Sequence, residues 1–201
     1  MKKSVLAIVG SYRKGGVIDQ TIDVILNTAS ERGAEVEKIY LADHRIEFCI
    51  KCRECAQHDS EHKQGNCVHK DDMPALFDKL AAADAVVLGS SVNFGTVTAQ
   101  MKRFIERLMV YAYWPWRKQI PVMRPSKKYR SAVVISSGAC PAFLGWFFLS
   151  YTRKILRTTA YIIGCKVVSS LYFGAVTIER GYRLSASQVK SVRKAAVKLL
   201  K

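Results

Sequence analysis

Short runs of apolar residues alternate along the chain with longer segments in which apolar residues recur every three or four positions. The short runs are mostly continuous and rich in valine and isoleucine, which is typical of strands buried on both faces of a parallel sheet. The first of them ends in Gly10, where a turn is expected. Strands are predicted at residues 4–10, 34–42, 85–92, 130–138 and 165–174.

The longer segments have the spacing of amphipathic helices. In the first, Ile18, Ile22 and Ile25 fall on one face and Gly33 marks the end. Helices are predicted at residues 18–33, 71–84, 98–111, within 142–161 and at 185–201. Strands alternating with helices predict a doubly wound α/β fold, in which right-handed crossovers cover both faces of a five-stranded parallel sheet. A chain of 201 residues suits one domain, spanning residues 1–201, with one core.

In a doubly wound sheet, ligands bind at the carboxyl ends of the strands where the winding reverses. For the strand order 2-1-3-4-5, that point lies between the first and third strands, so the turns after Gly10 and after Ser91 are expected to line a site. No Gly-x-Gly-x-x-Gly follows the first strand. Its absence argues against a dinucleotide-binding Rossmann fingerprint.

The turn after the first strand reads GSYRKGGVIDQT and leads into a predicted helix. Glycines, hydroxyls and bases at a helix N-terminus gather free N–H groups and positive charge around one point, which suits a phosphate. Glycine and serine are also common in ordinary turns. The turn after the third strand carries Asn93, Phe94 and Gly95, whose glycine lets backbone approach a flat ring, and Thr96 or Thr98 can cap the next helix.

The pairing of GSYRKGG with ADAVVLGSSVNFGTVTAQMKRFIER closely resembles the NAD(P)H-dependent FMN reductase family of the flavodoxin superfamily. The cysteine-containing segment that ends in CVHKDDM resembles the iron-sulfur flavoproteins of that family. The resemblance covers residues 4–110 and implies a flavodoxin-like fold that binds FMN. For the iron-sulfur members it also implies a [4Fe-4S] cluster.

Carried over by position, the resemblance implies that the first turn wraps the FMN phosphate and that the turns after the third and fourth strands flank the isoalloxazine ring. The residues implied are Ser11, Arg13, Gly16, Val17 and Ile18 for the phosphate, Val92, Asn93, Phe94 and Gly95 for the ring, and Gly138 and Ala139 for its far edge. The family pattern has proline where this chain has Tyr12, and tyrosine where it has Asn93. No catalytic side chain is implied, because hydride transfer to a flavin strictly needs no side-chain acid or base.

Residues 46–70 form a cysteine-rich loop. Its four cysteines are Cys49, Cys52, Cys55 and Cys67. The CxxCxxC spacing supplies three thiolates for a [4Fe-4S] cluster, although eleven residues separate Cys55 from Cys67, more than is usual in iron-sulfur flavoproteins. Zinc is a second hypothesis, with His58 and His62 as further ligands. Reduced thiols without metal are the third, but a loop of this length is unusual unless it has a function.

Charge is unevenly distributed along the chain, which has a formal net charge of +16. Residues 1–100 hold 12 Lys and Arg against 14 Asp and Glu, whereas residues 101–201 hold 20 against 2. This asymmetry fits either a solvated surface or a face for an anionic partner, such as a phosphorylated cofactor, an acidic electron carrier, anionic lipid or nucleic acid. Candidate cations for an acidic carrier or a dinucleotide phosphate are Arg103, Arg107, Arg117, Lys118 and Arg124.

An insertion at residues 111–130, YAYWPWRKQIPVMRPSKKYR, interleaves aromatic, proline and basic residues. It could roof a ring pocket or stack on nucleobases, but packing on its own domain or on a partner subunit is the expectation. No apolar run is long enough to span a bilayer, and the first residues lack a signal-peptide cleavage site. Together with cysteines spaced as reduced thiols, these features predict a cytoplasmic location.

The leading hypothesis is an FMN-binding oxidoreductase that takes electrons from NAD(P)H or from an acidic carrier such as ferredoxin. One alternative is a non-enzymatic, flavodoxin-like electron carrier, with tightly held FMN and negligible NAD(P)H oxidation. Another is a zinc-containing nucleic-acid-binding module, with no flavin and steeply salt-dependent binding. The resemblance also implies a homo-oligomer, either a dimer or a tetramer.

Overall fold

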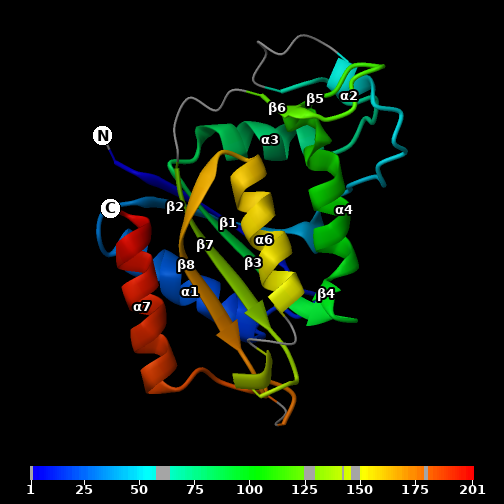
Figure 1. The fold of residues 1–201 in the computed structure, drawn as a ribbon. Helices are drawn as coiled ribbons and strands as arrows, with labels where there is room; N and C mark the ends of the chain where they lie inside the picture. The colour runs from blue at the N-terminus through cyan, green and yellow to red at the C-terminus, as the bar shows by residue number, and fades with distance from the viewer. Residues whose placement is uncertain (1, 58–63, 125–129, 142, 146–149, 179–180) are drawn as a thin grey trace.

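A computed structural model describes residues 2–57, 64–124, 130–141, 143–145, 150–178 and 181–201. Its centre is a twisted parallel sheet (Figure 1). The long strands are β1 (Ser4–Gly10), β2 (Glu35–Tyr40), β3 (Ala85–Asn93), β7 (Arg130–Ser137) and β8 (Cys165–Phe173). These are the five strands that the hydrophobic pattern predicts, and the observed ends lie within two residues of the predicted ones.

The strands follow the order β2-β1-β3-β7-β8, and each is parallel to its neighbours. This is the predicted order 2-1-3-4-5, so the flavodoxin-like, doubly wound class is confirmed. Three short strands were not predicted. They are β4 (Thr96–Val97), which pairs antiparallel with the end of β3, and β5 (Ala112–Tyr113) and β6 (Val122–Met123), which form a hairpin.

One face of the sheet is covered by α1 (Val17–Ser30) and α7 (Ala186–Leu199), which lie side by side (Figure 1). Their apolar stripes, represented by Ile22 and Val192, meet the side chains that point to this face from β1, β3 and β7, such as Val87. All three side chains are fully buried. The predicted helical spacing therefore places the apolar residues against the sheet.

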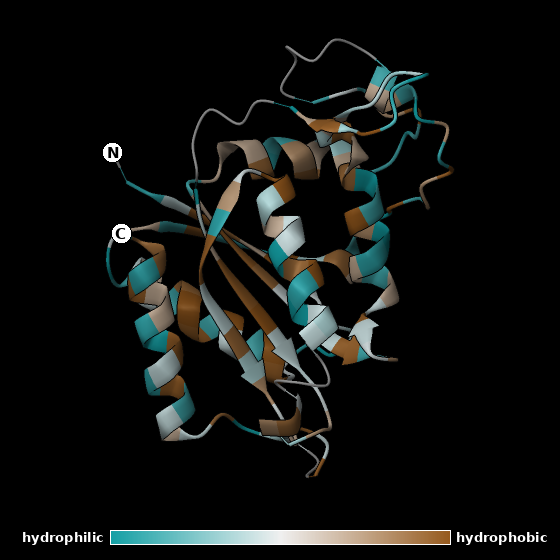
Figure 2. Cartoon of the chain, in the orientation of Figure 1, coloured by the Kyte–Doolittle hydropathy of each residue, from teal (hydrophilic) through white to brown (hydrophobic). Residues whose placement is uncertain are grey.

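The other face is covered by α3 (Met73–Ala82), α4 (Ala99–Arg107) and α6 (Ser150–Ile162). Phe104 and Leu88 are both fully buried in the cluster between these helices and the sheet. Figure 2 shows the consequence: the strands are apolar along the centre of the sheet, whereas the helices carry hydrophilic residues on their outer sides. No helix among the described residues is long and apolar enough to cross a membrane.

The cysteine-rich loop and the aromatic insertion lie together beyond the ends of α3 and α4, where α2 (Glu54–Gln57) and the β5–β6 hairpin are neighbours (Figure 1). The Trp114 N–H donates to the Ala56 carbonyl at 2.8 Å. The described part of the insertion thus packs on its own chain, as expected.

We expect Leu88→Ala to lower the free energy of unfolding by about 2–5 kcal/mol, because it leaves a cavity between β3 and the helices on that face. Leu88 is 0 % exposed. Ile120→Ala removes aliphatic groups of the same kind from a side chain that is 73 % exposed. It should lower the free energy of unfolding by less than about 0.5 kcal/mol. Urea unfolding followed by circular dichroism measures the free energy of unfolding of both variants. An equal loss of stability in the two would contradict the placement of β3 at the centre of the sheet.

Candidate functional site

A crevice of about 610 Å³ opens at the carboxyl ends of β1, β3 and β7. Its size suits a small-molecule cofactor. Four turns line it, at residues 11–17, 91–93 with 98, 137–139, and 176–177 with 181–182. The crevice therefore lies where the strand order predicts a ligand, next to the junction of β1 and β3.

Side-chain hydrogen bonds lock the turns after β1 and β3 together at the floor of the crevice. Thr98, one of the two residues predicted to cap the following helix, is the N-cap of α4, and its Oγ1 donates to the Gly10 carbonyl at 2.6 Å. Ser91 Oγ donates to Ser11 Oγ at 3.1 Å. A Cβ on Gly10 would lie 2.6 Å from the Met101 side chain. Only glycine therefore lets α4 approach β1 this closely.

The turn between β1 and α1 directs a helix N-terminus into the crevice. Gly16 is the N-cap of α1, and no side chain of the described residues caps the first turn. The backbone N–H groups in the first turn of α1, together with the positive end of the helix dipole, are therefore available to an anion. Arg13 is exposed at the same turn, and its carbonyl accepts from the Gly16 N–H at 3.3 Å. The arrangement fits a phosphate.

Asp19 anchors this turn to β2. Its carboxylate accepts hydrogen bonds from the Gly15 N–H at 2.5 Å, from Lys38 Nζ at 2.9 Å and from the Tyr40 hydroxyl at 2.7 Å. Burial alone raises the pKa of Asp19, but these hydrogen bonds and the charge of Lys38 outweigh burial and lower the pKa. The sequence alone did not point to Asp19, although an acid in the first turn of a helix is a recognisable signal.

The far end of the crevice is formed largely by backbone. The Gly138 N–H donates to the Phe173 carbonyl at 3.0 Å, and the Val176 N–H donates to the Gly138 carbonyl at 3.3 Å. The loop after β8 thereby joins the turn after β7 and brings Tyr182 to the crevice. This loop was not predicted to contribute, although it follows a strand that ends at the same edge of the sheet.

Eight of the eleven predicted FMN-binding residues line the crevice. They are Ser11, Arg13, Gly16, Val17, Val92, Asn93, Gly138 and Ala139. The other three lie elsewhere. Ile18 belongs to the first turn of α1, is 1 % exposed and packs in the core against the sheet. Phe94 and Gly95 have φ angles of 49° and 75° and form the turn between β3 and β4, where the Phe94 side chain is fully exposed.

The cysteine-rich loop folds back on itself. Gly65 packs so tightly that a Cβ there would lie 1.7 Å from the Cys55 carbonyl oxygen, so this approach requires glycine. The Gly65 N–H also donates to the Val110 carbonyl at 2.7 Å. The Gly65–Cys55 approach brings the chain back to the CxxCxxC segment two residues before Cys67, although eleven residues separate Cys55 from Cys67.

The four cysteines of this loop share one neighbourhood and form no disulfide. Burial, followed by electrostatic interaction with the other three cysteines, raises the pKa of Cys55 to about 11. Lys51 and Arg53, on either side of Cys52, have φ angles of 54° and 64°. Such left-handed backbone is uncommon outside glycine and is concentrated at functional sites, and turns of this kind can direct N–H groups toward an iron-sulfur centre.

Within the described residues, however, no group of three or more Cys, His, Asp or Glu side chains lies close enough to hold a metal ion. The donor chemistry of four thiols suits a cluster, but the sulfur atoms would have to move closer together to bind one. His58 and His62, the further ligands of the zinc hypothesis, lie outside the described residues.

Arg107 lies in the interior beside Cys67. Its guanidinium forms a fully buried, two-armed ion pair with Asp71, with Nη2 3.2 Å from Oδ1. It also donates to the Glu47 carbonyl at 2.9 Å and to Cys67 Sγ at 3.3 Å. A buried guanidinium needs such partners, because removing it from water costs several kcal/mol.

The prediction that five cations form an anion-binding surface is wrong for two of them. Arg107 is 2 % exposed, and Arg124 is 5 % exposed. Arg124 donates to the Val110 carbonyl at 3.0 Å and to the Cys55 carbonyl at 3.1 Å. Both guanidinium groups hold the cysteine-rich loop from inside. Arg117 and Lys118 are exposed, and Arg103 is half-buried.

Aromatic residues of the insertion hold the same loop from outside. The Arg53 guanidinium lies 4.0 Å from the ring centroid of Trp114 and 4.4 Å from that of Trp116. It also donates to the Trp114 carbonyl at 2.6 Å. Cation–π contacts of this kind stabilise the packing, and they occupy aromatic faces that a nucleobase would need.

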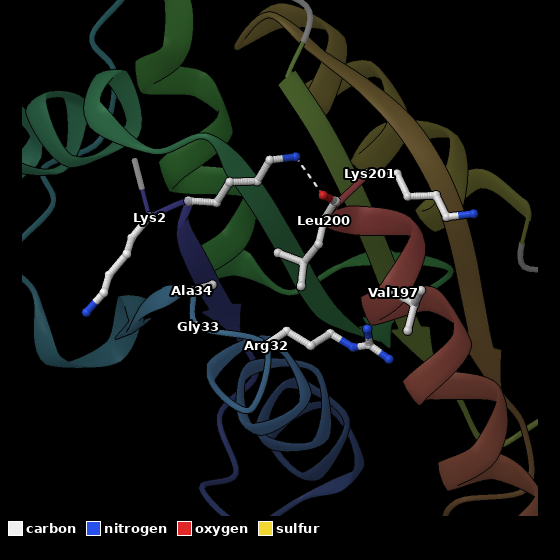
Figure 3. Close-up of a pocket in the computed structure, with 8 residues that line it drawn as sticks. Lys2, Arg32, Gly33, Ala34, Val197, Leu200 and Lys201 are labelled. Atoms are coloured by element: carbon white, nitrogen blue, oxygen red, sulfur yellow. Dashed lines mark hydrogen bonds between the residues drawn. The ribbon is translucent and has the colours of Figure 1, made fainter.

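A second hollow, of about 630 Å³, lies at the opposite end of the sheet, between the C-terminal ends of α1 and α7 (Figure 3). Lys2, Lys3, Arg32 and Lys201 line it, and Lys3 Nζ donates to the Leu200 carbonyl at 2.6 Å. Cations at helix C-termini compensate the negative end of the helix dipole. The Lys3 contact is of this kind, and the hollow lies at the end of the sheet opposite to the one where doubly wound folds bind their ligands.

Comparison with protein families and curated proteins finds similarity to flavin-binding proteins. The family profile described as NADPH-dependent FMN reductase matches residues 3–140. An iron-sulfur flavoprotein of Archaeoglobus fulgidus is 35% identical over 133 residues, which cover 66% of this chain and 54% of that protein. One of Methanocaldococcus jannaschii is 36% identical over 103 residues, covering 51% of this chain and 49% of that protein. The chain thus spans about half the length of these curated relatives.

Solved structures share the fold over the whole chain. An NAD(P)H:quinone oxidoreductase from Methanothermobacter marburgensis has a TM-score of 0.73 at 16% identity, with 100% of both chains covered. An FMN-dependent NADH-azoreductase from Bacillus anthracis, determined in complex with FMN, has a TM-score of 0.70 at 13% identity, with 99% of this chain and 100% of that chain covered. At these identities the likeness establishes the flavodoxin-like fold.

We expect Asp19→Asn to lower the free energy of unfolding by about 1–3 kcal/mol at neutral pH, because the buried hydrogen bonds lose their charged acceptor. An aspartate with a lowered pKa stabilises the fold above its ordinary value near 3.9. That stabilisation is lost as the pH falls through the lowered pKa. The difference from the wild type should therefore shrink below about pH 4, as measured by urea unfolding at several pH values.

Asp43→Asn is the matched control. Asp43 forms an exposed ion pair with Lys14 at 2.7 Å, and its loss should change the free energy of unfolding by less than about 0.5 kcal/mol at every pH. Equal stability of Asp19→Asn and wild type at neutral pH would show that Asp19 does not anchor the turn.

Proposed function

Because the chain belongs to the NADPH-dependent FMN reductase family, we propose that it is an oxidoreductase that binds FMN in the crevice and reduces it with NADPH or NADH. The observation that carries this proposal is the crevice itself. It combines the open N-terminus of α1 with turns after β3 and β7 at one edge of the sheet.

The residues of the crevice fit FMN. A phosphate at the N-terminus of α1 would receive the uncapped N–H groups of the first turn and the guanidinium of Arg13. The turns at residues 91–93 and 137–139 present backbone and small side chains, between which a flat ring can lie. Thr98 and Ser11 hold these turns in register through the hydrogen bonds at the crevice floor.

FMN, when bound, supplies the chemistry by accepting a hydride and passing electrons onward. The chain binds its phosphate, orients its ring and limits access of water. Among the described residues that line the crevice there is no carboxylic acid and no histidine. This composition suits a reaction in which the protein positions the reactants without general acid–base catalysis.

We further propose that Cys49, Cys52, Cys55 and Cys67 hold a [4Fe-4S] cluster, which would supply one-electron transfer. The similar curated proteins are named iron-sulfur flavoproteins. The shared neighbourhood of the four thiols, the left-handed backbone around Cys52 and the buried Arg107 beside Cys67 support this proposal. An acidic electron carrier would meet the exposed cations Arg117 and Lys118 near this loop.

The purified chain, supplied with FMN, is expected to lose the visible absorbance of the flavin when NADPH is added without oxygen. Arg13→Gln should raise the Kd for FMN about tenfold, because it removes a charge-assisted contact with the phosphate. The Kd for riboflavin, which lacks the phosphate, should not change. Titration of flavin fluorescence measures both constants.

Arg32→Gln removes the same charge from the opposite end of the sheet and should change neither constant. Equal weakening of FMN and riboflavin by Arg13→Gln would contradict a phosphate at this turn. Tight FMN without reduction by NADPH would favour a non-enzymatic electron carrier. No flavin binding, with zinc present and salt-dependent binding of nucleic acid, would favour the nucleic-acid-binding module.

The chain purified without oxygen is expected to contain about four irons. Cys67→Ala should lose most of this iron and still bind FMN, because Cys67 is not among the residues that line the crevice. Cys165→Ala is the control, since Cys165 is 3 % exposed in the core and should retain the iron. Iron analysis and flavin absorbance on the same samples decide the outcome. A wild-type chain without iron would refute the cluster and leave the FMN proposal standing.

A further inference from the structure

Gln20 of α1 joins the turn after β1 to the loop after β8. Its Nε2 donates to the Gly15 carbonyl at 2.8 Å and to the Tyr182 carbonyl at 2.9 Å. Its Oε1 accepts from the Leu184 N–H at 3.3 Å. Both amide hydrogens and the amide oxygen are thus used on backbone groups of two segments that are far apart in the sequence. Gly15 and Tyr182 line the crevice, whereas Gln20 itself is not among its lining residues.

Two consecutive residues of α1 hold Gly15 from both sides. The Gly15 N–H donates to the Asp19 carboxylate at 2.5 Å, and the Gly15 carbonyl accepts from Gln20. Gly15 has a φ angle of 76°, a left-handed conformation that glycine adopts without strain. The two contacts fix the orientation of this part of the turn. A carbonyl oxygen that would repel a phosphate is thereby bound to Gln20, beside a helix N-terminus whose N–H groups attract one.

A second glutamine holds the loop after β8 from the other side. Gln188, in the first turn of α7, donates from Nε2 to the Tyr182 hydroxyl at 2.8 Å and accepts at Oε1 from the Ser185 N–H at 2.8 Å. The side chains of Tyr182 and Leu184 also pack against the apolar cluster on this face of the sheet. Residues 181–184, of which 181 and 182 line the crevice, therefore rest on α7 through Gln188 and on α1 through Gln20.

We propose that Gln20 is a positioning residue of the cofactor site. It couples the turn at residues 11–17 to the segment 181–184, so that a phosphate bound at the turn also fixes this wall of the crevice. The inference rests on the proposed function and adds a residue that does not touch the crevice. Because coupling between two parts of a protein is reciprocal, loss of the Gln20 contacts should weaken phosphate binding and loosen the segment 181–184 together.

Gln20→Met keeps the length and helix propensity of the side chain but removes its donors and its acceptor. We expect it to raise the Kd for FMN about tenfold, the effect of losing one or two hydrogen bonds. The Kd for riboflavin, which places no phosphate at the turn, should rise less than about threefold. Asn27→Leu is the matched control, because it replaces an exposed amide on the same helix and should change neither constant. Titration of flavin fluorescence measures these constants.

Hydrogen exchange followed by NMR tests the coupling itself. In the flavin-free chain, the Leu184 N–H should exchange about tenfold faster in Gln20→Met than in wild type, because its acceptor is lost. FMN should slow exchange across residues 181–184 of wild type, at least about threefold more than riboflavin does. In Gln20→Met this difference between the two flavins should disappear. A residue that only supported the fold would not change it.

Three results would overturn the inference. One is the same Kd for FMN in Gln20→Met and wild type. Another is an equal loss of affinity for FMN and riboflavin, which would make Gln20 a support of the whole crevice and not a link to the phosphate. The third is equal slowing of exchange by both flavins in wild type. This last measurement needs no variant, so it decides the question even if Gln20→Met does not fold.

Failure of this inference can be told apart from failure of the proposed function. If wild type binds neither flavin, the proposed function fails, and with it the assignment of the coupling to FMN. Exchange of the Leu184 N–H in the flavin-free chain then still decides whether Gln20 holds the segment 181–184. If wild type binds FMN and reduces it with NADPH, but Gln20→Met behaves in the same way, the proposed function stands and Gln20 is not a positioning residue.

Discussion

The position of β1 between β2 and β3 is the constraint on which the candidate site depends. Parallel strands need crossover connections, and these are right-handed. The connection from β1 to β2 therefore places α1 on one face, and the connection from β2 to β3 places α3 on the other. The turns after β1 and β3 diverge toward opposite faces, and the crevice is the space between them. Backbone pairing of Gly10 with Ser90 brings these turns side by side.

The cysteine-rich loop is stabilised in a different way from the sheet. It lies outside the sheet, and polar groups hold it together as much as apolar contacts do. Arg107 and Arg124 extend into its interior and satisfy backbone carbonyls that a loop would otherwise expose to water. Arg53 joins it to the tryptophans of the insertion. Two segments far apart in sequence thus form one unit at the end of α4.

Positive charge serves at least two purposes in this chain. Arg107 and Arg124 are interior structural groups. Lys3 and Arg32 lie near the C-terminal ends of α7 and α1, where positive charge compensates the helix dipole, and Lys3 also donates to the Leu200 carbonyl. Net charge therefore says little about function until each cation is placed.

The sequence by itself determined the five long strands, because periodicity and glycine-rich turns are local properties of the chain. Their order, and the edge of the sheet at which a ligand is expected, came from the doubly wound class that this pattern indicates. The resemblance carried by motifs such as GSYRKGG also pointed to eleven residues, of which eight line the crevice. Only the tertiary structure decided that Arg107 is buried, that the Phe94 side chain is exposed outside the crevice, that Tyr182 lines the crevice and that Asp19 anchors one of its turns. These outcomes depend on neighbours distant in sequence: whether a cation reaches solvent or a carboxylate is settled by packing, which no local pattern records.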